Sequence, residues 1–93
     1  MNNEKNIKIL NLSKDINEIL ELLNNPYFDR NKAQDIIIKH NLNNEKVALV
    51  NSPLNPTYVR FEHSTDDMMK NNIVLILEIL KADLSEELAK KLR

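Results

Sequence analysis

Segment 30–42 has the polar and apolar periodicity of an amphipathic helix. Four of its residues are three or four positions apart and would share an inward face, namely Ala33, Ile36, Ile37 and His40. Asp29 lies where an N-cap belongs, because its carboxylate can accept hydrogen bonds from the unpaired amides of a first turn. The pattern therefore predicts a helix over Arg30–Leu42, with Asn41 to Asn44 as its stop. Its outward face would carry Arg30, Asn31, Lys32, Gln34 and Lys39.

The preceding segment predicts another helix over residues 14–24, with Ser13 as its N-cap. Its apolar face is broad and consists of Ile16, Ile19, Leu20, Leu22 and Leu23. Asn24-Asn25-Pro26 would end it, because the residue before a proline avoids the helical region. Tyr27 and Phe28 then lie between the two helices, where we expect them to be core residues that fix the interhelical angle.

Three short segments have the alternation or the Val, Tyr and Phe content that is typical of strands. They cover residues 6–11, 45–51 and 57–63. The last two are joined by Ser52-Pro-Leu-Asn-Pro56, which lacks the Asn-Gly or Asp-Gly of a tight turn. We therefore expect a hairpin with a wide, protruding tip.

A long helix is predicted after Ser64, which has capping-box spacing to Asp67. Many of its apolar residues are three or four positions apart, namely Met69, Ile73, Ile76, Leu77, Leu80 and Leu84. Val74, Leu75 and Ile79 make it apolar around much of its circumference, which indicates burial on more than one side. We therefore expect helix 65–92 to form a homodimer through those six residues. Ser85 could start a new helix or lie within the same one.

The composition is that of one folded domain, with 93 residues, 42% hydrophobic and 29% charged. A core this small favours oligomerisation. The chain lacks cysteine, and its first residues lack the apolar run of a signal peptide, so a cytoplasmic protein is expected. The longest apolar run, Ile73–Leu77, is too short to cross a bilayer.

The order strand, helix, helix, strand, long turn, strand, long helix resembles the winged helix-turn-helix family. The resemblance covers residues 7–63 and implies an α+β fold, with a winged-helix-like unit over 6–63 inside the single domain 1–93. It also implies double-stranded DNA as a partner, contacted by Arg30, Asn31, Lys32 and Gln34 in the major groove and by Lys39 on the backbone. The wing would add Ser52, Asn55, Thr57, Tyr58 and Arg60. A small transcription regulator, or a plasmid or phage accessory protein acting at an origin of replication or conjugative transfer, fits this size in bacteria.

Net charge gives the main argument against DNA binding, because 13 basic and 14 acidic residues leave a charge of −1. The alternative is a module that binds a protein partner, or a phage-type inhibitor that presents acidic surface to a nucleic-acid-binding target. The position of the cations separates the two hypotheses. A DNA-binding protein would place Arg30, Lys32, Lys39, Lys46 and Arg60 on one face, and scattering them among carboxylates would weaken that hypothesis.

The sequence predicts no catalytic residues, no metal site and no cofactor. His40 and His63 have no partner at metal-ligand spacing, and a chain without glycine cannot form a glycine-rich phosphate loop. The serines lie in cap or turn contexts, and an enzyme would need a deep pocket of converging polar groups, which we do not expect.

Overall fold

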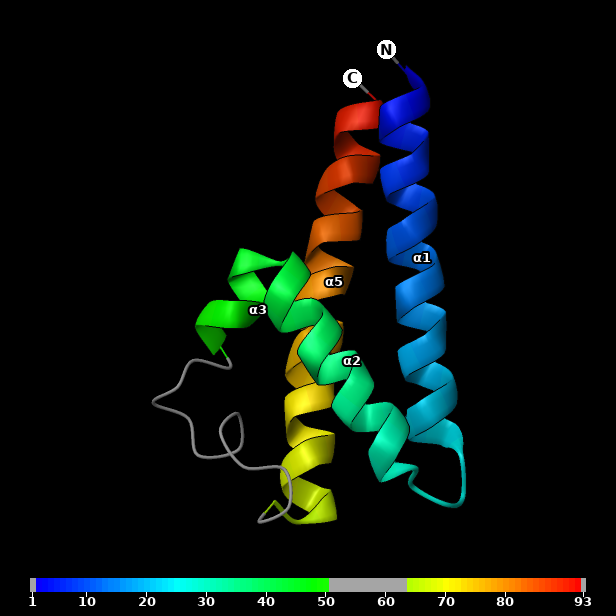
Figure 1. The fold of residues 1–93 in the computed structure, drawn as a ribbon. Helices are drawn as coiled ribbons and strands as arrows, with labels where there is room; N and C mark the ends of the chain where they lie inside the picture. The colour runs from blue at the N-terminus through cyan, green and yellow to red at the C-terminus, as the bar shows by residue number, and fades with distance from the viewer. Residues whose placement is uncertain (1, 51–63, 93) are drawn as a thin grey trace.

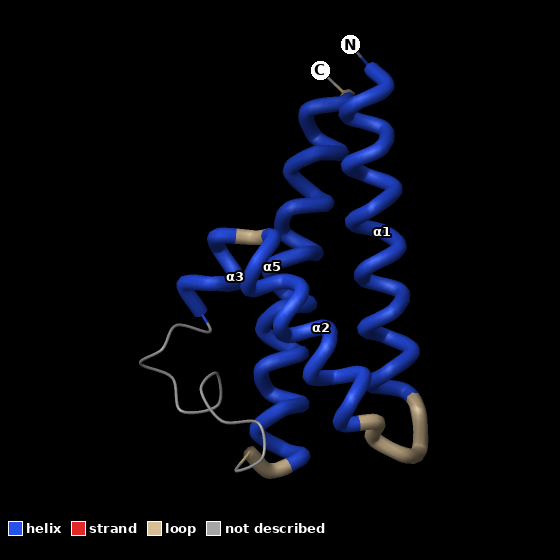
Figure 2. The backbone as a smooth tube through the Cα atoms, in the orientation of Figure 1, coloured by secondary structure: helices blue, strands red, loops and turns tan. Residues whose placement is uncertain are grey.

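A computed structural model shows a helical protein. The structure describes residues 2–50 and 64–92, and the side chains from residue 6 onward within these ranges. The described residues form α1 (Asn2–Asn24), α2 (Arg30–Asn43), α3 (Glu45–Val50) and α5 (Asp66–Lys91). These ranges contain no strand, as the tube in Figure 2 shows. The predicted α+β winged-helix-like fold is therefore wrong, and the fold is all-α.

The helices form two layers (Figure 1). Helices α1 and α5 lie side by side in opposite directions and share the largest contact of the structure, so the two chain ends are neighbours. Helix α2 crosses this pair obliquely along one half of its length, and α3 turns away from the end of α2. The other half of the α1–α5 pair extends beyond α2 and α3.

Residues 6–11, predicted as a strand, belong to α1. Their alternation spans too few residues to separate a strand from a helix. Ile9 and Leu12 also continue the helical spacing of Ile16 and Ile19, so one seam along α1 faces α5. Ser13, predicted as an N-cap, consequently lies inside the helix. The predicted end at Asn24 is confirmed.

Residues 45–50, predicted as a strand, form the short helix α3. Asn44 connects it to α2: its backbone amide donates to the His40 carbonyl at 3.0 Å, and its side-chain oxygen accepts from the Lys46 amide at 3.0 Å. Val47 is fully buried, so local capping and packing override the β-propensity of the two valines. The predicted strand 57–63 and the hairpin tip lie outside the described residues.

The prediction for α2 is confirmed. Asp29 is the N-cap and accepts from the Lys32 amide at 3.1 Å. The buried residues of α2 are the four expected from the spacing, Ala33, Ile36, Ile37 and His40. Of the two aromatic residues before α2, Phe28 packs against the core, but Tyr27 is 84% exposed. Because Tyr27 has little apolar contact, the prediction of a core role is wrong for it.

Helix α5 is continuous to Lys91, so Ser85 starts no new helix. Its N-cap is Thr65, whose hydroxyl accepts from the Met68 amide at 3.1 Å, in place of the predicted Ser64. Ser64 is buried, and its carbonyl accepts from Arg30. The hydrophobic core joins all four helices and consists of Leu12, Ile16, Ile19, Leu22, Ala33, Ile36, Ile37, Val47, Met69, Ile73, Ile76, Leu77 and Leu80.

Candidate functional site: a charged notch at the junction of the helices

Three of the five cations expected on a DNA-binding face, Arg30, Lys39 and Lys46, are held in ion pairs within the chain. Arg30 pairs with Asp66 and also donates to the Ser64 carbonyl at 2.7 Å. Lys39 pairs with Asp15 at 2.9 Å, and Lys46 pairs with Asp83 at 2.8 Å. These cations are thus distributed among carboxylates of α1 and α5, which is the arrangement that weakens the DNA hypothesis.

The remaining predicted DNA contacts divide into two groups. Asn31 and Lys32 are exposed on the first turn of α2, and Gln34 is half-buried. The wing residues Ser52, Asn55, Thr57, Tyr58 and Arg60 lie outside the described residues. Within the described residues, the structure therefore brings no cluster of predicted DNA-contacting cations to one free face.

Most residues predicted to form the dimer interface lie inside the chain's own core. Met69, Ile73, Ile76, Leu77 and Leu80 are buried, and Leu84 is half-buried against the core. Their apolar face contacts α1 and α2 of the same chain, since these helices are the main neighbours of α5. A dimer contact through α5 would therefore need its exposed apolar residues, such as Val74, Leu75 and Leu88.

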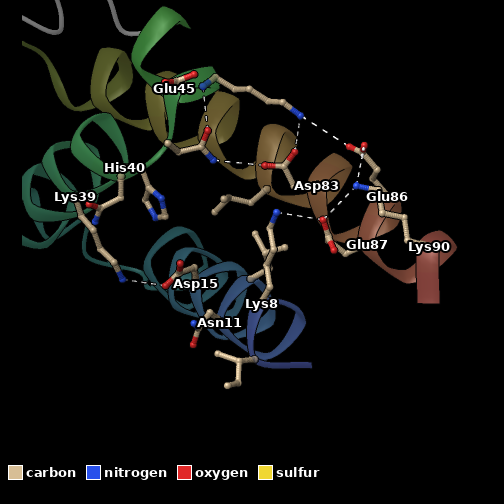
Figure 3. Close-up of a pocket in the computed structure, with 16 residues that line it drawn as sticks. Lys8, Asn11, Asp15, Lys39, His40, Glu45, Asp83, Glu86, Glu87 and Lys90 are labelled. Carbon is tan, nitrogen blue, oxygen red and sulfur yellow. Dashed lines mark hydrogen bonds and ion pairs between the residues drawn. The ribbon is translucent and has the colours of Figure 1, made fainter. Parts of the chain in front are cut away.

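A concave notch forms beside the α1–α5 pair where α2 ends and α3 begins (Figure 3). It has a volume of about 690 Å³ and is open to solvent. Its walls come from residues 7–15 of α1, the end of α2, Asn44, the start of α3 and residues 80–90 of α5. Leu12 and Leu80, both buried, provide its apolar floor. Every described helix therefore contributes to this site.

Ion pairs connect the walls of the notch. Lys39 of α2 reaches Asp15 of α1, and Lys8 of α1 reaches Glu87 of α5 at 3.1 Å. At the α3 wall, Lys46 pairs with Asp83. Lys90 lies 3.7 Å from both Glu86 and Glu87 on its own helix, a contact that the three- and four-residue spacing allows.

The carboxylates lie deeper in the notch than the lysines that pair with them. The side chains of Asp15, Asp83 and Glu87 are 20, 17 and 9% exposed. Their partners Lys39, Lys46 and Lys8 are 49, 62 and 61% exposed. The interior of the notch is thus acidic, and the ammonium groups cover it from the solvent side.

These hydrogen-bonded pairs change the proton affinity of two lysines. The hydrogen bond to Asp15 is the largest cause that raises the pKa of Lys39 above its ordinary value, while burial opposes it. The hydrogen bond to Asp83 likewise raises the pKa of Lys46. Both ammonium groups therefore stay charged at neutral pH, and neither is suited to act as a general base.

His40 is a buried titratable group of the notch and lies near the end of α2. It is only 5% exposed, it lines the notch and its ring points toward the interior (Figure 3). No hydrogen bond joins this ring to another described residue. Burial lowers the pKa of His40 below its ordinary value, opposed by the nearby carboxylate of Asp15. The imidazole is therefore neutral at physiological pH and retains one donor and one acceptor nitrogen.

The described part of the chain holds neither a candidate metal site nor a candidate membrane span. No group of three His, Cys, Asp or Glu side chains in it converges closely enough to hold a metal ion. None of its helices combines the length and apolar character required to span a bilayer.

In comparisons with protein families, characterised proteins and solved structures, nothing matches this chain. The proposals below therefore rest on the chain's own residues.

The notch was not predicted from the sequence. Its charged residues come from four segments, and lysine and glutamate in alternation are ordinary on exposed helix faces. One local signal was present, the spacing of Glu86 and Glu87 to Lys90, but it indicates only a helix. The pairing of α1 with α5 was required to find the rest, and the predicted strand at 6–11 concealed it.

Proposed function

We propose that the protein is a non-catalytic protein-interaction module whose notch receives a segment of a partner protein. The observation that carries this proposal is the notch itself, a concave surface with an apolar floor and a charged rim to which every described helix contributes. Such a combination of apolar contact and polar orientation is what a binding site for a protein segment needs. The cytoplasmic location expected from the sequence is part of this proposal.

The charge distribution supports a protein partner over DNA. Phosphate binding needs cations that are free to replace counterions. Arg30, Lys39 and Lys46 are each held by a carboxylate, so a phosphate would compete with an existing ion pair. A protein segment can instead exchange ion pairs with both members of such a pair.

Double-stranded DNA is the second candidate partner, because Asn31 and Lys32 are exposed at the N-terminal turn of α2. Amide and ammonium groups at this end of a helix are suited to base edges and phosphates. A regulator or a plasmid or phage accessory protein would use this surface to bind DNA. The duplex titration described below tests this candidate.

The test is selection of a displayed library of random 15-residue peptides on the immobilised protein. Enriched peptides are then measured by fluorescence anisotropy against wild type, Asn11→Trp and Asn71→Trp. Asn11 lines the notch and is exposed, so an indole there obstructs the notch without disturbing the core. Asn71 is exposed on α5 outside the notch lining and is the matched control.

We expect Asn11→Trp to weaken binding at least tenfold and Asn71→Trp to leave it unchanged. No enrichment, or equal binding to all three proteins, would contradict the proposal. In a parallel titration, fluorescent random duplexes are measured at low salt with Asn31→Ala and Lys32→Ala. Tight duplex binding that both variants lose would replace the protein partner with DNA.

A further inference from the structure

In the notch, the carboxylates are less exposed than the lysines that pair with them, and this difference indicates which ligand the notch can bind. Asp15, Asp83 and Glu87 are the inner charges, and each is covered by a lysine that is about half or more exposed. Water can hydrate such an exposed ammonium group when it leaves. The carboxylate that it leaves is largely buried and needs a new cation in its place.

His40 is an independent sign of a ligand at the same place. Its ring is buried and points into the notch without a hydrogen-bond partner among the described residues. The imidazole therefore presents hydrogen-bonding capacity to the notch that no other described side chain uses. A neutral imidazole nitrogen accepts a hydrogen bond from a cationic N–H group. The carboxylates and His40 thus favour the same ligand chemistry.

We propose that the notch binds a cationic, arginine-bearing segment of a partner protein, whose guanidinium groups replace the covering lysines on Asp15, Asp83 and Glu87. This inference rests on the proposed function and names the chemistry of its partner. A bound segment would bring its apolar residues against Leu12 and Leu80 and place one N–H group at His40.

An extended cation suits these carboxylates better than a metal ion or a single ammonium group. The carboxylates do not converge on one point, since no group of three such side chains among the described residues can hold a metal ion. They lie on two helices, with Asp15 on α1 and the others on α5. Arginine also forms two parallel hydrogen bonds with one carboxylate, whereas lysine acts as a point charge. An arginine-bearing segment therefore has a geometric advantage over the lysines that it displaces.

The first arm of the test measures fluorescein-labelled hexa-arginine binding by anisotropy at low and moderate salt. Asp15→Asn and Asp83→Asn each remove one inner charge, and Glu78→Gln removes an exposed charge of α5 that does not line the notch. We expect roughly tenfold weaker binding for each notch variant, because each variant loses one charge-assisted hydrogen bond. Glu78→Gln should change it less than twofold.

The second arm separates the notch from general electrostatic attraction. Lys46→Met removes a covering lysine, and Lys81→Met removes an exposed lysine of α5 outside the notch, so the two variants have the same net charge. We expect Lys46→Met to bind hexa-arginine several-fold more tightly than Lys81→Met does. Equal affinities would overturn ion-pair exchange, and equal affinity of wild type for hexa-lysine and hexa-arginine would overturn the preference for guanidinium.

The outcomes also separate this inference from the proposed function. Selected peptides that lose binding to Asn11→Trp but carry no arginine, together with absent hexa-arginine binding, would overturn the cationic partner and leave the interaction module intact. If no peptide is selected and hexa-arginine does not bind either, both proposals are overturned. Circular dichroism of each variant confirms that the helices are retained.

Discussion

The two halves of the α1–α5 pair have different neighbours and different side chains. In the half that α2 covers, the facing residues are apolar and fully buried, as Ile19 and Ile73 show. In the half that extends beyond α2, the contact between the two helices includes the ion pair of Lys8 with Glu87. Large apolar side chains such as Leu10 are exposed there. One helix pair therefore combines a packed core with an open, charged surface.

The difference shows how this fold positions its candidate site. Two helices bury little apolar surface on their own, and a third helix is what excludes water from the seam. Where the third helix ends, water and charge replace apolar packing, and the notch opens at that step. The covered half should therefore carry most of the folding free energy, and the uncovered half should carry the binding chemistry.

The largest effect should come from a cavity in the covered half. Ile73→Ala removes a fully buried side chain of α5, and we expect a loss of about 2–5 kcal/mol in the free energy of unfolding. Leu10→Ala removes a side chain that is 69% exposed in the uncovered half, and we expect a change within about 0.5 kcal/mol. Urea unfolding followed by circular dichroism measures both. Equal losses would mean that the uncovered half is packed against something in solution.

The sequence predicted the helices whose periodicity is long and regular. In α2, the N-cap Asp29 and all four buried residues followed from the spacing, because a polar cap and one apolar stripe are sufficient to define an amphipathic helix. The extent of α5 was also predicted, but its apolar face was assigned to a second copy. One chain has two helices, α1 and α2, that cover this face, and single-sequence patterns do not show which partner a face will take.

The strand predictions failed at residues 6–11 and 45–50 for a common reason. Each window is so short that β-branched or alternating residues fit either structure, and tertiary contacts made the choice. As part of α1, residues 6–11 lie beside α5, and Val47 is buried in the hydrophobic core. Once both windows are helical, the lysines and carboxylates of α1, α3 and α5 meet, so the notch depends on the elements that the sequence left ambiguous.

A medium effect should come from the helix caps at the covered end. Asp29→Ala and Thr65→Ala each leave an N-terminal amide of α2 or α5 without its side-chain acceptor, and we expect losses of about 1 kcal/mol. Asp35→Ala, an exposed aspartate inside α2, is the control and should change stability by less than about 0.5 kcal/mol. Thermal unfolding reports all three. If Asp35→Ala lost as much stability as Asp29→Ala, the loss of a negative charge on α2 would explain the effect of Asp29→Ala in place of capping.

The smallest effect should be a pH dependence from His40, which lies where the covered half meets the notch. Burial is the main cause that lowers its pKa below the ordinary value of 6.5, with Asp15, Glu18 and Lys39 as the charged groups around it. Below pH 6.5 the unfolded chain therefore binds a proton at this residue more readily than the folded chain does.

It follows that the contribution of His40 to stability is complete above pH 6.5 and is lost as the pH falls from there through the lower, folded pKa. Urea unfolding at pH 7.5, 6.5 and 5.5 should show decreasing stability, and His40→Leu should reduce that slope because an aliphatic side chain takes no proton. A slope that is unchanged in His40→Leu would assign the pH dependence to other groups and would contradict the lowered pKa of His40.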